Sequence, residues 1–103
     1  MNPFPDNFVG VGVELTMREE LPIVVKTLRG GPAEQAGLEA DDRLVAIDHS
    51  PIRGLALADV VVRLRGREGS KVGVTVQRGK VAIDTELVRH SMERTQTGYT
   101  ARE

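Results

Sequence analysis

Two glycines separated by one valine, Gly10-Val11-Gly12, stand directly before a run of alternating apolar residues. Glycine allows a tight turn and leaves neighbouring amide groups exposed, so a loop of this kind can bind an anion. The alternating run behind the loop predicts a β-strand, which can pair with another extended chain. These features favour a site for the end of an extended peptide, although the same glycines also suit a plain turn or bulge.

Other residue types that carry chemistry occur without the spacing that their chemistry needs. Neither histidine has a second histidine or a carboxylate at metal-ligand spacing, and no serine stands in a G-x-S-x-G motif or has a recognisable lysine partner. There is no cysteine. The G-x-G-x-x-G dinucleotide fingerprint is incomplete, because Leu15 stands where the third glycine is required. We therefore expect no catalytic residue, no metal site and no cofactor in this segment.

The composition bounds the class of protein. A chain of 103 residues is expected to form one domain with its own hydrophobic core. The net charge of -1 and an aromatic content of 3% argue against nucleic acid as a partner, because neither a basic footprint nor stacking platforms are available. No apolar run reaches membrane-spanning length, so we expect no membrane contact by this segment. The lack of cysteine is compatible with either redox environment and leaves the compartment open.

The pattern of apolar residues predicts a mainly β chain with two helices. Strands are expected over residues 11–17, 21–28, 43–48, 72–76 and 81–87, with a short helix over 32–37 that has proline in its first turn and glycine past its end. Residues 55–65 are ambiguous because three consecutive valines favour a strand, but their length and the following Gly66 favour a longer helix. Residues 1–7 are expected to be a flexible lead-in, and residues 90–103 a disordered tail or a linker fragment.

Four ordered motifs run through the chain: GVGV at residues 10–13, GPAEQAGL at 31–38, DRLVAID at 42–48, and a run from Gly54 to Val72 that contains LRG. In this order they resemble the G-Φ-G-Φ loop, the GSPA-x-x-AGL segment, the GD-x-I-x-x-I turn and strand, and the LRG run of PDZ domains. The similarity is greatest to the PDZ domains of bacterial carboxy-terminal processing, or tail-specific, proteases. Asp41 departs from the usual glycine of the GD turn, which is tolerable because aspartate can adopt a left-handed conformation.

The resemblance covers residues 8–89 and implies a PDZ-like, partly open antiparallel barrel of five to six strands, capped by a short and a longer helix. It also implies that a peptide adds as a strand beside Val13 to Met17. The residues implied for the carboxylate-binding loop are Gly10, Val11, Gly12 and Val13; those for the peptide groove are Glu14, Leu15, Met17, Leu57, Val61 and Leu64. From spacing alone, the stripe of apolar residues on the longer helix also fits a core-facing surface.

The implied partners are protein or peptide C-termini with apolar last residues, because leucine stands at the first groove position of the helix, and an adjacent protease domain. The segment would then be the substrate-recruiting or regulatory domain of a serine protease with a Ser/Lys catalytic domain, located in the bacterial cell envelope or periplasm. Alternative hosts are a trypsin-like protease, a site-two-type protease or a scaffold without protease activity. We expect Gly12→Asp or Leu57→Asp to weaken peptide binding without unfolding the domain.

Overall fold

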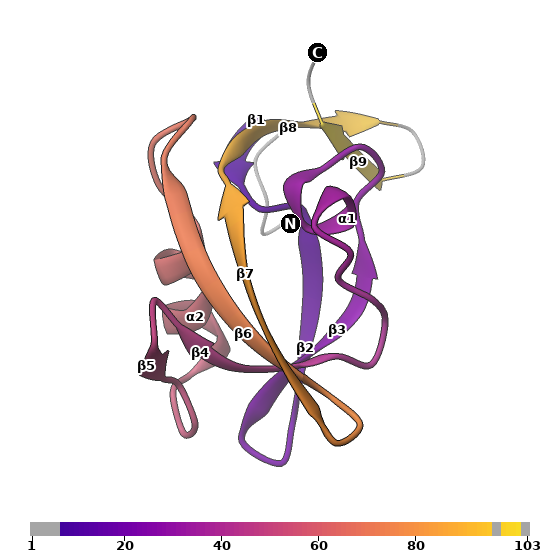
Figure 1. Cartoon of the computed structure of the whole chain (residues 1–103). Coiled ribbons are helices and arrows are strands. Elements are labelled where there is room, and N and C mark those ends of the chain that lie inside the picture. The colour runs from indigo at the N-terminus through magenta and orange to yellow at the C-terminus, as the bar shows by residue number, and fades with distance from the viewer. Residues whose placement is uncertain (1–6, 96–97, 102–103) are drawn as a thin grey trace.

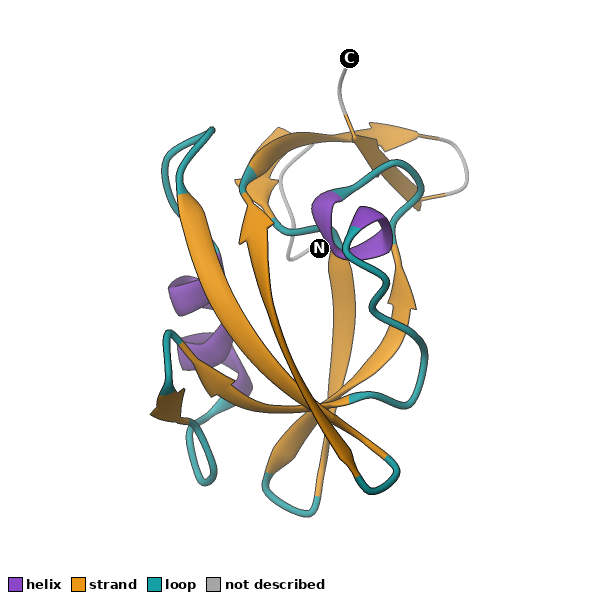
Figure 2. Cartoon of the chain, viewed as in Figure 1, coloured by secondary structure: helices purple, strands orange, loops and turns teal. Residues whose placement is uncertain are grey.

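A strongly curled antiparallel sheet forms the body of the molecule, and a second, smaller sheet lies across one end of it (Figure 1). The computed structural model describes residues 7–95 and 98–101. The larger sheet has the strand order β2-β3-β4-β6-β7, with β5 paired to β4, and the smaller sheet has the order β1-β8-β9. The two helices lie outside the curled sheet (Figure 2). This arrangement is the mainly β fold with two helices that the sequence predicted.

Two hairpins supply most of the larger sheet. The first joins β2 (Val13–Arg18) to β3 (Leu21–Thr27) through Glu19 and Glu20. Both turn residues have positive φ angles, 53° and 69°, as a tight turn between twisted strands requires. The second hairpin joins β6 (Lys71–Arg78) to β7 (Val81–Val88) in continuous register. Between the hairpins lies β4 (Arg43–Ile47), whose end pairs with the two-residue strand β5 (Ser50–Pro51).

The helices form where the sequence predicted them, with shorter bounds. Helix α1 (Pro32–Gln35) has proline in its first turn and buries Ala33 completely. Helix α2 (Leu57–Leu64) buries Val60 and Leu64, so the three consecutive valines are helical and only one of them faces the core. Asp41 has a φ of 74°, which confirms that aspartate replaces the usual glycine in a left-handed conformation.

The core is built almost entirely from aliphatic side chains inside the curled sheet. Its members come from both hairpins, both helices and the loop before β2, so burying this cluster fixes the helices against the sheet. The buried cluster consists of Val11, Leu21, Ala33, Leu38, Leu44, Ile47, Ile52, Val60, Leu64, Val72, Val74, Val76 and Leu87.

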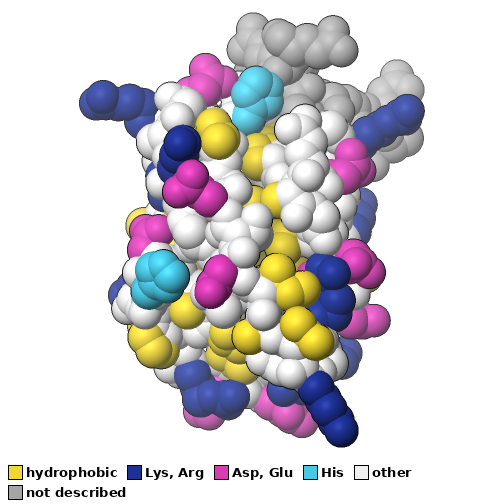
Figure 3. All heavy atoms as spheres, viewed as in Figure 1, with side chains coloured by type: hydrophobic (Ala, Val, Ile, Leu, Met, Phe, Trp, Pro, Cys, Tyr) yellow, Lys and Arg dark blue, Asp and Glu magenta, His cyan; other side chains and the backbone are white. Residues whose placement is uncertain are grey.

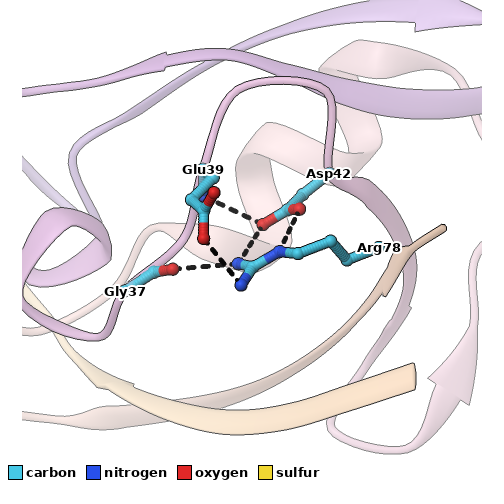
Figure 4. A network of polar contacts seen from close by, with 4 residues as sticks. All are labelled: Gly37, Glu39, Asp42 and Arg78. Atoms are coloured by element: carbon cyan, nitrogen blue, oxygen red, sulfur yellow. Dashed lines mark hydrogen bonds and ion pairs between the residues drawn. The ribbon is translucent and has the colours of Figure 1, made fainter. Parts of the chain in front are cut away.

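One charged side chain is buried beside this core. Asp42 is 1% exposed, and its carboxylate oxygens accept hydrogen bonds from Nε and Nη2 of Arg78, both at 2.8 Å (Figure 4). Arg78 also donates to the Gly37 carbonyl and pairs with Glu39 at 2.8 Å. The hydrogen bonds from Arg78 lower the pKa of Asp42, although burial acts in the opposite direction. The network ties the end of β6 to the loop that follows α1.

The smaller sheet corrects the prediction for the end of the chain. The sequence predicted a disordered tail or a linker fragment from His90, whereas β8 (His90–Thr95) and β9 (Gly98–Ala101) are strands. Strand β8 pairs with β1 (Asn7–Gly10), placing Phe8 opposite Met92. The pairing joins segments about eighty residues apart, and β8 has only one apolar residue, Met92, so local periodicity gave no strand signal. Asn7, expected in the lead-in, begins β1; residues 1–6 lie outside the described residues.

Candidate functional site

A groove of about 230 Å³ runs between β2 and α2. One side is formed by the chain from the end of β1 into the start of β2, and the other by one face of α2. Most of its side chains are aliphatic. The lining residues are Gly10, Val11, Gly12, Val13, Glu14, Leu15, Leu57, Val61, Leu64 and Arg65. Thus the fold brings together nine of the ten residues that the sequence assigned to a peptide site.

The loop between β1 and β2 has its carbonyl groups turned away from the groove. The Val11 carbonyl accepts a hydrogen bond from the Ala33 amide at 2.9 Å, and the Gly12 carbonyl accepts one from the Leu28 amide at 2.8 Å. In a trans peptide the N–H group points opposite to the C=O group of the same peptide plane. The amides of Gly12 and Val13 therefore point away from α1 and β3. Two neighbouring N–H groups with this orientation form a concavity suited to an anion.

Among the residues that the structure describes, no strand pairs with the outer edge of β2. Strand β2 stands at one end of the strand order, with β3 on its other side. The bond from the Leu28 amide to the Gly12 carbonyl makes Val13 and Thr27 a non-hydrogen-bonded pair. The amide and carbonyl of Val13 consequently face the open side of the strand, toward the groove. An extended chain placed there would find both a donor and an acceptor for strand pairing.

Gly12 is held in a conformation and a space that suit glycine alone. Its φ is +71°, and a Cβ atom at this position would lie 3.2 Å from the Met92 Cε atom and 3.3 Å from the Gly31 Cα atom. A side chain would therefore meet both backbone strain and crowding. The Gly12→Asp variant, expected from the sequence to leave the fold intact, is instead expected to destabilise the loop. Leu57→Asp remains the cleaner test of binding.

Helix α2 divides its apolar residues between the core and the groove. Val60 is fully buried and Leu64 is 4% exposed, whereas Leu57 and Val61 are half-buried and line the groove. The apolar stripe on this helix is therefore only partly buried in the core. Spacing alone had also allowed a stripe that faces the core completely. Apolar side chains left partly exposed in a groove can be covered by an apolar ligand.

Two residues differ from the predicted site. Met17 is 36% exposed and does not line the groove, since it lies toward the β2–β3 turn opposite Pro22. Arg65 does line the groove, at the C-terminal cap of α2. Its neighbour Leu64 was predicted, but an arginine in a charged run gave no sign that it borders the site. It contributes a positive charge at the end of the groove that also contains the loop.

The remaining described surface offers less chemistry. Within residues 7–95 and 98–101, no group of three metal-ligating side chains is close enough to hold a metal ion, and no helix is long and apolar enough to cross a membrane. A larger cavity, of about 370 Å³, lies between α1 and the end of β7. It is lined in part by Gln35, Glu86 and His90, and the amide of its one lining glycine, Gly30, already donates to the Glu34 carboxylate at 2.9 Å. The β2–α2 groove is therefore the better candidate site.

Comparison with known proteins agrees with this geometry. The family model described as "PDZ domain" matches residues 9–88. The chain belongs to the PDZ domain family. PDZ domains are binding modules, and the match includes the loop, β2 and α2, so the groove lies within the part of the chain that defines the family. The resemblance read from the sequence motifs is confirmed.

Two relatives of this PDZ domain are proteases that are several times longer than the chain. It is 35% identical over 86 residues to a probable CtpA-like serine protease from Staphylococcus aureus and 40% identical over 82 residues to a carboxyl-terminal-processing protease from Picosynechococcus. These alignments cover 84% and 78% of the chain but only 17% and 19% of the two relatives. A solved PDZ domain of a carboxy-terminal protease from Vibrio cholerae, in complex with a peptide, has a TM-score of 0.76 and 29% identity, covering 82% of this chain and 96% of that domain.

Proposed function

We propose that this PDZ domain binds the C-terminal carboxylate and the apolar last residues of a protein by β-strand addition to β2. The observation that carries the proposal is the orientation of the loop and strand. The Gly12 and Val13 amides point away from the carbonyl-bound side of the loop, and the backbone of Val13 faces the open edge. A terminal carboxylate brings a full negative charge that such amides stabilise by charge-assisted hydrogen bonds.

The walls of the groove favour an apolar terminal side chain. Val11 and Val13 lie beside the loop, and Leu57 and Val61 face them from α2. Arg65 adds a positive charge near the same end, which is compatible with an anionic peptide terminus. We expect modest affinity, roughly micromolar or weaker, because ordering a flexible peptide offsets much of the gain from strand pairing.

Within a longer protein, this domain would recruit or present a substrate tail to a serine protease. The support is the identity to CtpA-like and carboxyl-terminal-processing proteases over most of this chain. The domain spans less than a fifth of those relatives, so the catalytic step would belong to a separate part of the protein. A protease of this type would place the domain in the bacterial cell envelope or periplasm.

Amidation of the peptide terminus tests the proposed chemistry directly. A labelled peptide ending in Leu-Ala-Val is titrated with the domain in two forms, as the free acid and as the C-terminal amide. Because amidation removes the charge while leaving the side chains in place, we expect the amide to bind at least about tenfold more weakly. Equal affinity of the two forms would contradict carboxylate recognition and leave only internal strand addition.

A further inference from the structure

Strand β8, which follows the residues matched by the PDZ family model, packs against the proposed carboxylate loop. The PDZ match ends at residue 88, yet Met92 in β8 is fully buried. Its Cε atom lies 3.2 Å from the position that a Cβ of Gly12 would occupy, and 3.5 Å from the corresponding position at Gly31. Because neither glycine has a side chain, the end of the flexible Met92 side chain can pack against the backbone of both.

We propose that Met92 is a positioning residue of the peptide site, which supports the loop so that the Gly12 and Val13 amides keep facing the groove. This inference rests on the proposed function. The loop is held on one side by hydrogen bonds from Ala33 and Leu28 to its carbonyls. Those bonds fix the direction of the amides only while the loop keeps its distance from α1. The end of the Met92 side chain packs against both Gly12 and Gly31, whose backbones lie in contact, and so holds the loop at this distance from α1.

Backbone pairing fixes Met92 at this place. Strand β8 pairs with β1 so that His90 lies opposite Gly10 and Met92 opposite Phe8. Gly10 is the last residue of β1 and the loop follows it directly. The pairing of β1 with β8 therefore fixes the position of the loop relative to β8. The start of β8 is also held by Glu68. The Glu68 carboxylate accepts hydrogen bonds from the Ser91 amide at 3.0 Å and from the Ser91 hydroxyl at 2.6 Å. Met92 is therefore placed by two independent attachments.

The same segment also holds the opposite wall of the groove. Arg89, directly before β8, donates from Nε to the Leu64 carbonyl at 3.0 Å and from Nη2 to the Arg63 carbonyl at 3.1 Å. These carbonyls belong to the last turn of α2, whose acceptors have no partner within the helix. Gly66 permits this approach, because a Cβ there would lie 2.8 Å from the Arg89 Nε atom. Residues 89–92 thus contact both sides of the site.

The test compares two substitutions that empty equally buried positions. Met92→Ala removes the support under the loop, whereas Ile52→Ala empties a core position that does not line the groove; both side chains are fully buried. Each variant is titrated with the Leu-Ala-Val peptide as free acid and as amide, and its melting temperature is recorded. We expect Met92→Ala to bind the acid about tenfold more weakly, the effect of losing one hydrogen bond to a charge, with the amide little changed. Ile52→Ala should lower the melting temperature and leave the acid-to-amide ratio unchanged.

A merely structural role for Met92 would give a different result. The positioning role is wrong if Met92→Ala lowers the affinities for the acid and the amide by the same factor. It is also wrong if Met92→Ala and Ile52→Ala have the same affinities for the two peptide forms. Should Met92→Ala fail to fold, Met92→Leu keeps most of the volume without the same reach and is expected to shift the ratio in the same direction by a smaller factor. An unchanged ratio in a folded Met92→Leu variant would then overturn the proposal.

Amide hydrogen exchange in the free domain separates this proposal from the proposed function. Met92→Ala should speed exchange of the Ala33 and Leu28 amides, which donate to the loop carbonyls, several-fold more than Ile52→Ala does, whatever the peptide result. If the unaltered domain shows no preference for the free acid but the exchange rates change as expected, carboxylate recognition fails and the support of the loop stands. If the acid is preferred and exchange is the same in both variants, the positioning role fails instead.

Discussion

The two end strands of the larger sheet, β2 and β7, each lie near a helix and border a cavity, but the cavities differ in chemistry. The β2–α2 groove combines a glycine loop with aliphatic walls. The cavity between β7 and α1 is larger, and Gln35, Glu86 and His90 contribute to its lining. The face of the molecule that carries β6 and β7 shows acidic and basic side chains interspersed (Figure 3). Of these two sites, the smaller one is better suited to a peptide terminus.

The difference shows that an open strand edge does not by itself make a peptide site. Outward-facing carboxylates stand along β7, where Asp84 accepts a hydrogen bond from the Thr75 hydroxyl and Glu86 lies 3.5 Å from the Lys71 ammonium group. Charged side chains on an edge strand discourage pairing with another chain. A peptide carboxylate would also be repelled by Glu86. Edge β2 instead begins at the glycine loop, whose amides are the proposed carboxylate site, so under this proposal the loop distinguishes the two edges.

The largest expected effect comes from placing an acidic side chain in the β2–α2 groove. Leu57→Asp should weaken binding of the free-acid peptide by about a hundredfold, because it removes apolar contact and sets a negative charge in the peptide's path. The matched control is Val62→Asp on the same helix, since Val62 is 70% exposed and does not line the groove. Calorimetric titration measures the peptide affinity of both variants. If Leu57→Asp and Val62→Asp bind the peptide equally well, the peptide does not bind in the β2–α2 groove.

The next effect concerns stability on the β7 side of the molecule. Asp42→Asn should lower the free energy of unfolding by about 2 kcal/mol, because the buried partner of Arg78 loses its charge. Peptide affinity at 25 °C should stay within about twofold, since neither residue lines the groove. Urea unfolding and peptide titration measure the two quantities. A large loss of affinity in a folded variant would contradict the separation of the two regions.

The same pair predicts how stability depends on pH. Hydrogen bonds from Arg78 lower the folded-state pKa of Asp42 below its ordinary value of 3.8. Stability from this carboxylate is therefore fully present above pH 3.8 and is lost as the pH falls through the lowered folded-state pKa. Urea unfolding between neutral and acid pH should show a shallower loss for Asp42→Asn than for the unaltered domain. Parallel pH profiles would contradict the role of Asp42.

A smaller effect is expected at the charged end of the β2–α2 groove. Arg65→Gln should weaken the free-acid peptide by about threefold and leave the amide unchanged, because a partly exposed charge acts weakly on a neighbouring carboxylate. Added salt should shrink the difference between the variant and the unaltered domain. If the acid and amide are affected equally, Arg65 contributes packing rather than charge.

The smallest effect is expected at β7 itself. Glu86→Gln removes the acidic group from the larger cavity and should leave affinity for the free-acid peptide unchanged. An increase in affinity, or a second binding event in the titration, would mean that Glu86 alone prevents β7 from binding a carboxylate. In that case, a single side chain would account for the difference in peptide binding between edges β2 and β7.

Several elements were predictable because their signals are local. The alternation in residues 13–17 and 81–87 reflects one buried face of each strand, and the proline and glycine that flank α1 report the backbone geometry of its ends. Gly12 and Leu57 were assigned to one site because the order of motifs resembles a known family. Arg65 was not assigned, since a charged residue after a helix has no local mark of facing a groove.

The sequence by itself predicted five strands of the larger sheet, both helices, the absence of cysteine chemistry and, through the family resemblance, nine groove residues that the fold brings together. Only the tertiary structure placed the glycine loop beside an open edge of the sheet and brought Met92 against Gly12. The direction of the Gly12 and Val13 amides follows from hydrogen bonds to Leu28 and Ala33. The side chain that packs against Gly12 is Met92, about eighty residues away. Contacts of this kind depend on long-range pairing and packing, which leave no periodic trace in the residues that make them.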